Sequence, residues 1–106
     1  MKQSKVYGVL SLAARGRNVV SGEFSTISAV KDGSAVLVIV AEDASDNTKK
    51  LFKDKCAFYK VPIYTYGTKA ELGHAMGKAE RSSLALVNEG LARSIEKHLE
   101  ALQIRR

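Results

Sequence analysis

The chain has 106 residues, of which 45% are hydrophobic and 26% are charged, with a single proline. This length suits one domain with one core, and this composition argues against a disordered or collagen-like chain. Seventeen Lys and Arg against eleven Asp and Glu give a formal net charge of +6, a bias that attracts polyanions such as RNA but does not by itself identify a partner.

The first third of the chain predicts two helices with a short strand between them. Apolar residues recur at helical spacing over residues 4–14, and Gly16 is the residue expected to end this helix in a left-handed conformation. The apolar pair at 19–20 predicts a short strand. After a turn signal, near-helical spacing over residues 24–30 predicts a second, short helix that ends before Gly33.

The middle of the chain predicts the central strand of a sheet and a longer helix. Residues 35–41 are apolar at every position and rich in β-branched types, which is typical of a strand covered on both faces. Any of Ser45, Asp46 or Asn47 is a suitable N-cap for the helix that follows. The apolar face expected on that helix consists of Leu51, Phe52, Cys56 and Tyr59.

The next segment predicts a strand followed by a short, capped helix. Residues 61–66 suit a strand, with Pro62 near its start, where a missing N–H is tolerated. Thr68 with Glu71 three residues later is a capping-box pattern. The short helix that it opens is expected to stop at Gly77.

The last segment predicts a third apolar strand over residues 83–87 and a final helix over residues 90–102. The apolar face expected on this helix consists of Leu91, Ile95, Leu99 and Leu102. Helices that alternate with apolar strands imply a sheet covered on both faces. We therefore expect an α/β protein, a three-layer α/β/α sandwich with a small mixed sheet, in which residues 1–106 form one domain.

Several function classes have little support in the sequence. One cysteine excludes an internal disulfide, and one cysteine with two histidines does not complete a four-ligand zinc site without carboxylates. The longest apolar run, residues 35–41, is far shorter than the ~20 residues of a membrane-spanning helix, and no signal-peptide pattern is present. We expect a cytoplasmic protein with no cofactor, no metal and no membrane association.

Candidate catalytic residues also have simpler interpretations. Cys56 falls on an apolar helix stripe, so a buried, inert thiol is the favoured interpretation. His98 is expected on a solvated helix face and His74 on a mobile surface. An acidic cluster follows the central strand and would suit Mg²⁺ or an acid–base pair, but helix capping is favoured. The cluster consists of Glu42, Asp43 and Asp46.

The basic residues divide into two sets. The first set follows the polar side of the predicted third helix, where a solvated face is the expected explanation. The second lies in or beside glycine-containing turns, where cations and backbone N–H groups can approach phosphates. The second set consists of Arg15, Arg17, Lys69, Lys78 and Arg81.

An ordered series of motifs resembles the superfamily of ribosomal proteins that bind kink-turn RNA, and within it the bacterial YlxQ branch. The resemblance covers about residues 4–100, and the series with its spacings is more specific than any one motif. The motifs are Gly-Glu-Phe-Ser-Thr-Ile-Ser-Ala-Val from Gly22, then Gly33, Ala-Glu-Asp from Ala41, Cys56, Val61-Pro62, and Glu-Leu-Gly-His-Ala-Met-Gly from Glu71.

The resemblance implies an α/β/α sandwich and an RNA-contacting motif, Gly-x-Asn-Glu-x-x-Lys, at the start of the second helix. Gly22 matches this motif, but Phe24, Ser25 and Ser28 occupy the Asn, Glu and Lys positions. The family's second contact is an apolar loop after Leu-Gly-x-x-Gly, which here is the charged segment 78–81. Loss of a base contact costs about 1–3 kcal/mol of discrimination, so the resemblance implies weakened kink-turn specificity.

Contacts to phosphates and to RNA shape need no sequence code and survive these replacements. Phe24 either stacks on an unpaired base or packs as a core or staple residue. We expect the five cations of the turns to converge on one rim of the protein that attracts anions. The predicted RNA-binding residues are Arg15, Arg17, Gly22, Phe24, Ser25, Ser28, Lys69, Lys78 and Arg81.

The expected function is that of a non-enzymatic, monomeric RNA-binding protein of the bacterial translation apparatus. Its expected partners are structured RNA, ribosomal or kink-turn-like, and ribosomal proteins. The missing Asn, Glu and Lys also suit a protein-interaction adaptor that retains the fold without specific RNA recognition. A hydrolase or metal-dependent enzyme that uses the acidic cluster is the third and least favoured alternative.

Overall fold

The computed structural model describes residues 4–104, as five helices and four strands. In chain order they are α1 (Lys5–Arg15), β1 (Val19–Ser21), α2 (Glu23–Asp32), β2 (Leu37–Val40), α3 (Asp46–Tyr59), β3 (Ile63–Thr65), α4 (Lys69–Ala75), β4 (Ser83–Leu86) and α5 (Glu89–Ile104).

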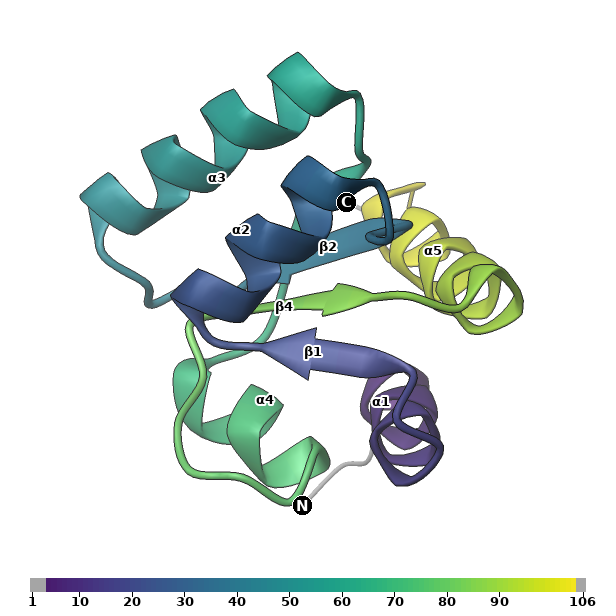
Figure 1. Cartoon of the computed structure of the whole chain (residues 1–106). Helices are drawn as coiled ribbons and strands as arrows, with labels where there is room; N and C mark the ends of the chain where they lie inside the picture. The colour runs from purple at the N-terminus through teal and green to yellow at the C-terminus, as the bar shows by residue number, and fades with distance from the viewer. Residues whose placement is uncertain (1–3, 105–106) are drawn as a thin grey trace.

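The four strands form one mixed sheet in the order β1-β4-β2-β3. β2 pairs with β3 in parallel, and β4 pairs with both β2 and β1 in the antiparallel sense. Helices α2 and α3 cover one face of the sheet, and α1 and α5 cover the other, with α4 beside α1 (Figure 1). The predicted three-layer α/β/α sandwich with a small mixed sheet is confirmed.

The two inner strands form the centre of the core. Every residue of β2 and of β4 is buried, because each of these strands has a neighbour on both sides and helices above and below. Val38 and Ile39 point to opposite faces of the sheet, and both are fully buried. The prediction of a strand covered on both faces is therefore confirmed for β2.

Side-chain caps begin four of the helices, and in α5 the cap is Asn88 Oδ1, which accepts from Leu91 N at 2.9 Å. Ser4 Oγ accepts a hydrogen bond from Val6 N at 3.0 Å at the start of α1. Ser45 Oγ accepts from Thr48 N at 3.1 Å at the start of α3, so Ser45 is the N-cap among the three candidates. Thr68 and Glu71 form the predicted capping box of α4. These caps satisfy backbone donors that a helix leaves free.

The end of α1 differs from the prediction by one residue. Gly16 has an ordinary φ of −92°, and Arg17 is the residue with the left-handed φ of 58°. Asn18 N donates to Ala13 O at 2.8 Å, which is the 6→1 hydrogen bond of a Schellman motif. In this motif the left-handed residue directly precedes the residue whose N–H donates that bond. Gly16 is nevertheless confined, since a Cβ there would lie 2.8 Å from Asn18 Nδ2.

Two side chains predicted on apolar helix faces are exposed. Tyr59 is the last residue of α3, and Leu102 lies in the last turn of α5. A side chain at a helix end has helical neighbours on one side only, so the apolar stripe loses its cover there. Within the described range, 4–104, no helix is both long and apolar enough to cross a membrane.

Candidate nucleic-acid interface

The first turn of α2 lacks a side-chain cap. Its N-cap residue, Gly22, has φ of 92° and ψ of 155° and makes no side-chain hydrogen bond. The backbone of Gly22 is fixed on both sides, because its N–H donates to Ser83 O at 3.0 Å and its carbonyl accepts from Thr26 N at 2.9 Å. The start of α2 therefore offers backbone donors and the positive end of a helix dipole to an anion.

The loop between α4 and β4 places a guanidinium beside this helix start. Arg81 Nε donates to Ser21 Oγ at 3.1 Å, and Arg81 N donates to Lys69 O at 3.1 Å. Arg81 Nη1 also donates to the carbonyl oxygens of Ala79 and Glu80. Figure 1 shows this loop rising past the end of β1 and the start of α2. Arg81 is therefore held in position and half-buried.

The packing of this loop on α4 depends on Gly73. A Cβ at Gly73 would lie 2.7 Å from the carbonyl carbon of Ala79 and closer still to its oxygen. Lys78 N donates to Gly73 O at 2.8 Å, and Gly77 turns the chain with φ of 72°. The sequence singled out this glycine pattern, but it predicted neither this packing role of Gly73 nor the role of Ser21 in holding Arg81.

The three residues in place of the family's Asn, Glu and Lys all lie exposed on the first turns of α2. Phe24 is 84% exposed, so its interpretation as a core or staple residue is wrong. Ser25 and Ser28 are also exposed. Thr26 between them is buried and pairs with Ser83 Oγ at 3.5 Å. One face of this turn thus anchors the helix and the other is open to a ligand.

The remaining predicted cations do not all reach this helix start. Lys69 accepts the hydrogen bond from Arg81 N through its carbonyl, and Lys78 lies after the other end of α4. Arg15 lines a shallow groove with His74 and Gly77, between α1 and the end of α4. The cations therefore follow α4 along its length.

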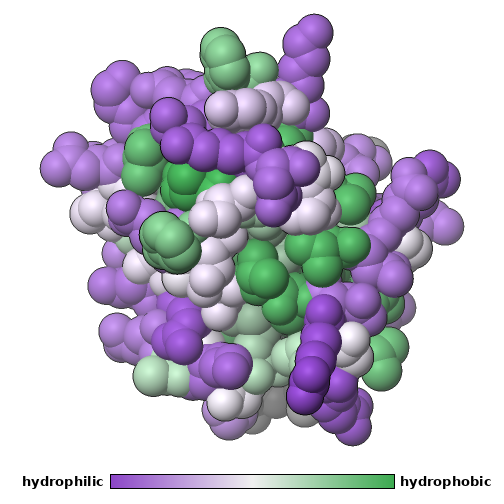
Figure 2. Space-filling view, viewed as in Figure 1, coloured by the Kyte–Doolittle hydropathy of each residue, from purple (hydrophilic) through white to green (hydrophobic). Residues whose placement is uncertain are grey.

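Arg17 lies at the other end of β1. The carbonyl of its neighbour Asn18 accepts from Val87 N at 2.9 Å, whereas Gly22 pairs with Ser83. Three residues of β1 at about 3.3 Å each separate the two ends by roughly 10 Å. Figure 2 shows hydrophobic side chains gathered around β1, between α2 and α1. Arg17 is therefore set apart from Gly22 and Arg81 by the length of β1, and its place in the expected rim stays a prediction.

Two of the three acidic residues after β2 lie at helix starts. Asp43 Oδ1 accepts from Lys69 N at 2.8 Å and so caps α4, which confirms the capping interpretation for this residue. Asp46 is the first residue of α3, behind the N-cap Ser45. Among residues 4–104, no three His, Cys, Asp or Glu side chains are grouped as metal ligands would be.

The candidate nucleophile and the histidines take ordinary places. Cys56 is buried in the core, and desolvation raises the pKa of its thiol to about 11, which confirms the buried thiol. His74 is exposed, as expected. His98, expected on a solvated face, is half-buried, because it lies beside Leu99 on the side of α5 that packs against the core.

A hydrogen-bonded pair joins α1 to the start of α4. Tyr7 Oη donates to Glu71 Oε1 at 2.7 Å, and the ring of Tyr7 lies 5.5 Å from that of Tyr66. The hydrogen bond from Tyr7, followed by that from Thr68 N, lowers the pKa of Glu71. Burial, followed by the hydrogen bond to Glu71, raises the pKa of Tyr7. The ionised carboxylate is therefore the form that the fold stabilises.

Stability should depend on the ionisation of Glu71. Because the pKa of Glu71 is lower in the folded state, its contribution is present above the ordinary value of about 4.3 and is lost as pH falls through the folded pKa. Glu71→Gln should therefore lose less stability than the parent between pH 6 and pH 3 in urea denaturation. Tyr7→Phe should show an intermediate dependence, and an unchanged acid loss in both variants would contradict the contact.

Most of this chain is similar in sequence to known proteins. The model of the ribosomal protein L7Ae/L30e/S12e/Gadd45 family matches residues 4–96. The RNA-binding protein YlxQ of Bacillus subtilis (strain 168) is 42% identical over 89 residues, which cover 84% of this chain and 89% of that protein. The RNA-binding protein YlxQ of Enterococcus faecium is 35% identical over 98 residues, which cover 92% and 94%.

A solved structure has the same fold throughout. It is that of a protein with unknown function from Bacillus halodurans C, and it matches with a TM-score of 0.90 at 36% sequence identity. The match covers 92% of this chain and 99% of that one. The order of helices and strands described above is therefore shared with a relative along nearly its whole length.

Proposed function

Because the chain belongs to the ribosomal protein L7Ae/L30e/S12e/Gadd45 family, we propose that it binds structured RNA at the start of α2. The observation that carries this proposal is the juxtaposition of the uncapped helix start at Gly22 with the guanidinium of Arg81. The name of its relatives, RNA-binding protein YlxQ, supports the same ligand class. We assign no catalytic role to the site.

The chemistry of this site suits an RNA backbone. A phosphate would accept hydrogen bonds from the free N–H groups of the first turn of α2, and Arg81 would neutralise its charge. Ser25 and Ser28 would add hydroxyl hydrogen bonds, and the exposed ring of Phe24 would stack on an unpaired base. Lys69, Lys78 and Arg15 would bind further phosphates of the RNA where it runs along α4. Arg17 would make a separate phosphate contact.

This mode of binding reads shape and charge more than sequence. The Asn, Glu and Lys that would contact the kink-turn bases are replaced, and each missing base contact removes about 1–3 kcal/mol of discrimination. We therefore propose a protein of the translation apparatus, cytoplasmic and monomeric, that binds ribosomal or kink-turn-like RNA with weakened kink-turn specificity. Ribosomal proteins bound to the same RNA are its proposed neighbours.

The proposal predicts that Arg81→Ala weakens binding to a ribosomal stem-loop RNA about tenfold or more, since a charge-assisted hydrogen bond contributes about 1.5–3 kcal/mol. The slope of log affinity against log salt should also become shallower by about 0.7–0.9 for each phosphate that the variant no longer neutralises. Filter binding or fluorescence anisotropy across a salt series measures both quantities.

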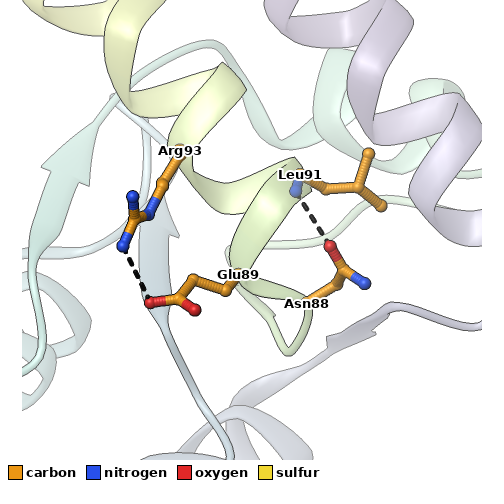
Figure 3. A network of polar contacts seen from close by, with 4 residues as sticks. All are labelled: Asn88, Glu89, Leu91 and Arg93. Carbon is orange, nitrogen blue, oxygen red and sulfur yellow. Dashed lines mark hydrogen bonds and ion pairs between the residues drawn. The ribbon is translucent and has the colours of Figure 1, made fainter.

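Arg93→Ala is the matched control. Arg93 Nη2 pairs with Glu89 Oε2 at 3.1 Å on α5, next to the Asn88 side chain that caps Leu91 N (Figure 3). Its removal changes the net charge by the same amount, but away from α2, so affinity should change by less than twofold. Equal losses in the two variants would mean that only net charge matters. No RNA binding by the parent protein would favour the adaptor instead.

A further inference from the structure

The last turn of α3 presents two aromatic rings to solvent. Phe58 is 76% exposed and Tyr59 is 38% exposed. Their ring centroids lie 4.9 Å apart at an interplanar angle of 76°. An exposed phenyl ring of this extent has no role in the core, and the site at the start of α2 does not use it.

The same helix carries much of the protein's positive charge. Residues 46–60 contain five lysines and two aspartates, a net charge of +3 out of the +6 of the whole chain. One of the aspartates, Asp54, pairs with Lys50 at 3.4 Å. Lys55 lies three residues before Phe58 and four before Tyr59, positions that are neighbours on a helix surface.

A second lysine follows the two rings directly in the sequence, and its backbone conformation is unusual for a residue with a side chain. Lys60 directly follows Tyr59 and has a left-handed backbone, with φ of 60° and ψ of 46°. Glycine or asparagine is the usual residue in this conformation at a helix end. The backbone N–H groups of Lys60 and Val61 both donate to Cys56 O, so this conformation closes the helix. Lys60 also supplies a second ammonium group one residue after Tyr59.

We propose that Phe58, Tyr59, Lys55 and Lys60 form a second RNA contact, which stacks unpaired bases of single-stranded RNA and neutralises the adjacent phosphates. Rings that stack bases beside cations that bind phosphates are the general pattern of single-strand recognition. The surplus of lysine favours a polyanion over an apolar protein partner, because lysine is depleted at protein interfaces. The proposal rests on the proposed function for its ligand class.

This contact is separate from the first site. Figure 1 shows the last turn of α3 and the first turn of α2 at opposite ends of the layer that the two helices form. A structured RNA bound at the start of α2 would therefore reach the α3 rings only through an unpaired extension. The two contacts can be tested with different RNAs.

Phe58→Trp provides a direct reporter, because the chain contains no tryptophan. Titration with a short oligouridylate should quench the fluorescence of the introduced indole, as base stacking does. Leu12→Trp is the control, at an exposed position on α1, and its fluorescence should stay constant. Absence of quenching at position 58, or equal quenching at both positions, would overturn the proposal.

Removal of the groups should separate the two sites. Phe58→Ala and Tyr59→Ala should each weaken oligouridylate binding about five- to a hundredfold, while binding of a stem-loop without unpaired tails stays unchanged. Arg81→Ala should weaken binding of the stem-loop and leave oligouridylate binding unchanged. Unchanged oligouridylate affinity in both ring variants would overturn the second contact and leave the first site standing. A change of sedimentation mass in Phe58→Ala would instead identify a second copy as the occupant.

Lys60→Gly separates function from stability. Glycine relieves the left-handed strain, so the thermal midpoint should rise, while oligouridylate affinity should fall with the removal of the cation. A variant that is more stable and binds less tightly cannot be explained by misfolding. A lower midpoint, or unchanged affinity, would show that the conformation of Lys60 serves the fold alone.

Discussion

Gly73→Ala is expected to lower the free energy of unfolding by about 3 kcal/mol, the upper end of the range for overpacking a closed site. The added methyl group would meet the Ala79 carbonyl and come within 3.1 Å of Glu80 Cα. Both neighbours are backbone, so no side-chain rotation can relieve the contact. Urea denaturation of the variant and the parent measures this loss.

Gly8→Ala is the control for helix propensity. Gly8 lies inside α1, and no atom lies within 4 Å of a Cβ built there. Alanine at this position should raise the free energy of unfolding by about 0.5–1 kcal/mol. A stabilised Gly73→Ala would mean that the loop after α4 does not pack on α4 as described.

Gly73→Ala should also weaken RNA binding, because it displaces Arg81. Displacement of Ala79 and Glu80 moves the two carbonyls that orient Arg81 Nη1 and shifts the residue away from Ser21. Affinity for a stem-loop RNA should therefore fall at least as far as in Arg81→Ala, when measured at a temperature where both variants are folded. The double variant should add little, since both changes remove the same contact.

The elements were predictable because their signals are local. Ser4, Ser45 and Thr68 cap helices through hydrogen bonds to donors two or three residues away, and such patterns are visible in the sequence. The continuous apolar run around β2 likewise predicts a doubly covered strand. The fold follows from these signals and from the rule that alternating helices and strands bury a common sheet.

The site was less predictable because its contacts join distant parts of the chain. Ser21 holds Arg81 across 60 residues, and Asp43 caps Lys69 across 26. No local pattern in the sequence indicates which turns meet, and the place of Arg17 in the predicted rim stays a prediction. The exposure of Phe24 was equally open, because an aromatic residue in a first helical turn suits either a staple or a ligand contact.

Gly22→Ala is expected to lower the free energy of unfolding by about 1–3 kcal/mol through backbone strain alone. No atom lies within 4 Å of a Cβ at Gly22, so a clash contributes nothing. Its φ of 92° with ψ of 155° lies outside the left-handed helical region and is accessible almost only to glycine. Chemical denaturation should give this loss without a change in the denaturant slope.

Gly33 provides the matched comparison, because its φ of 85° and ψ of 2° lie in the left-handed region that asparagine tolerates. Gly33→Asn should therefore cost clearly less than Gly22→Asn, although both residues have positive φ and flank the same helix. In Gly22→Ala the backbone at position 22 would relax to a conformation that alanine can adopt, and this change would tilt the first N–H groups of α2 away from the ligand. Stem-loop affinity should therefore also fall about tenfold. Oligouridylate binding at Phe58 should not change, and a parallel loss there would mean that α2 and α3 act as one binding surface.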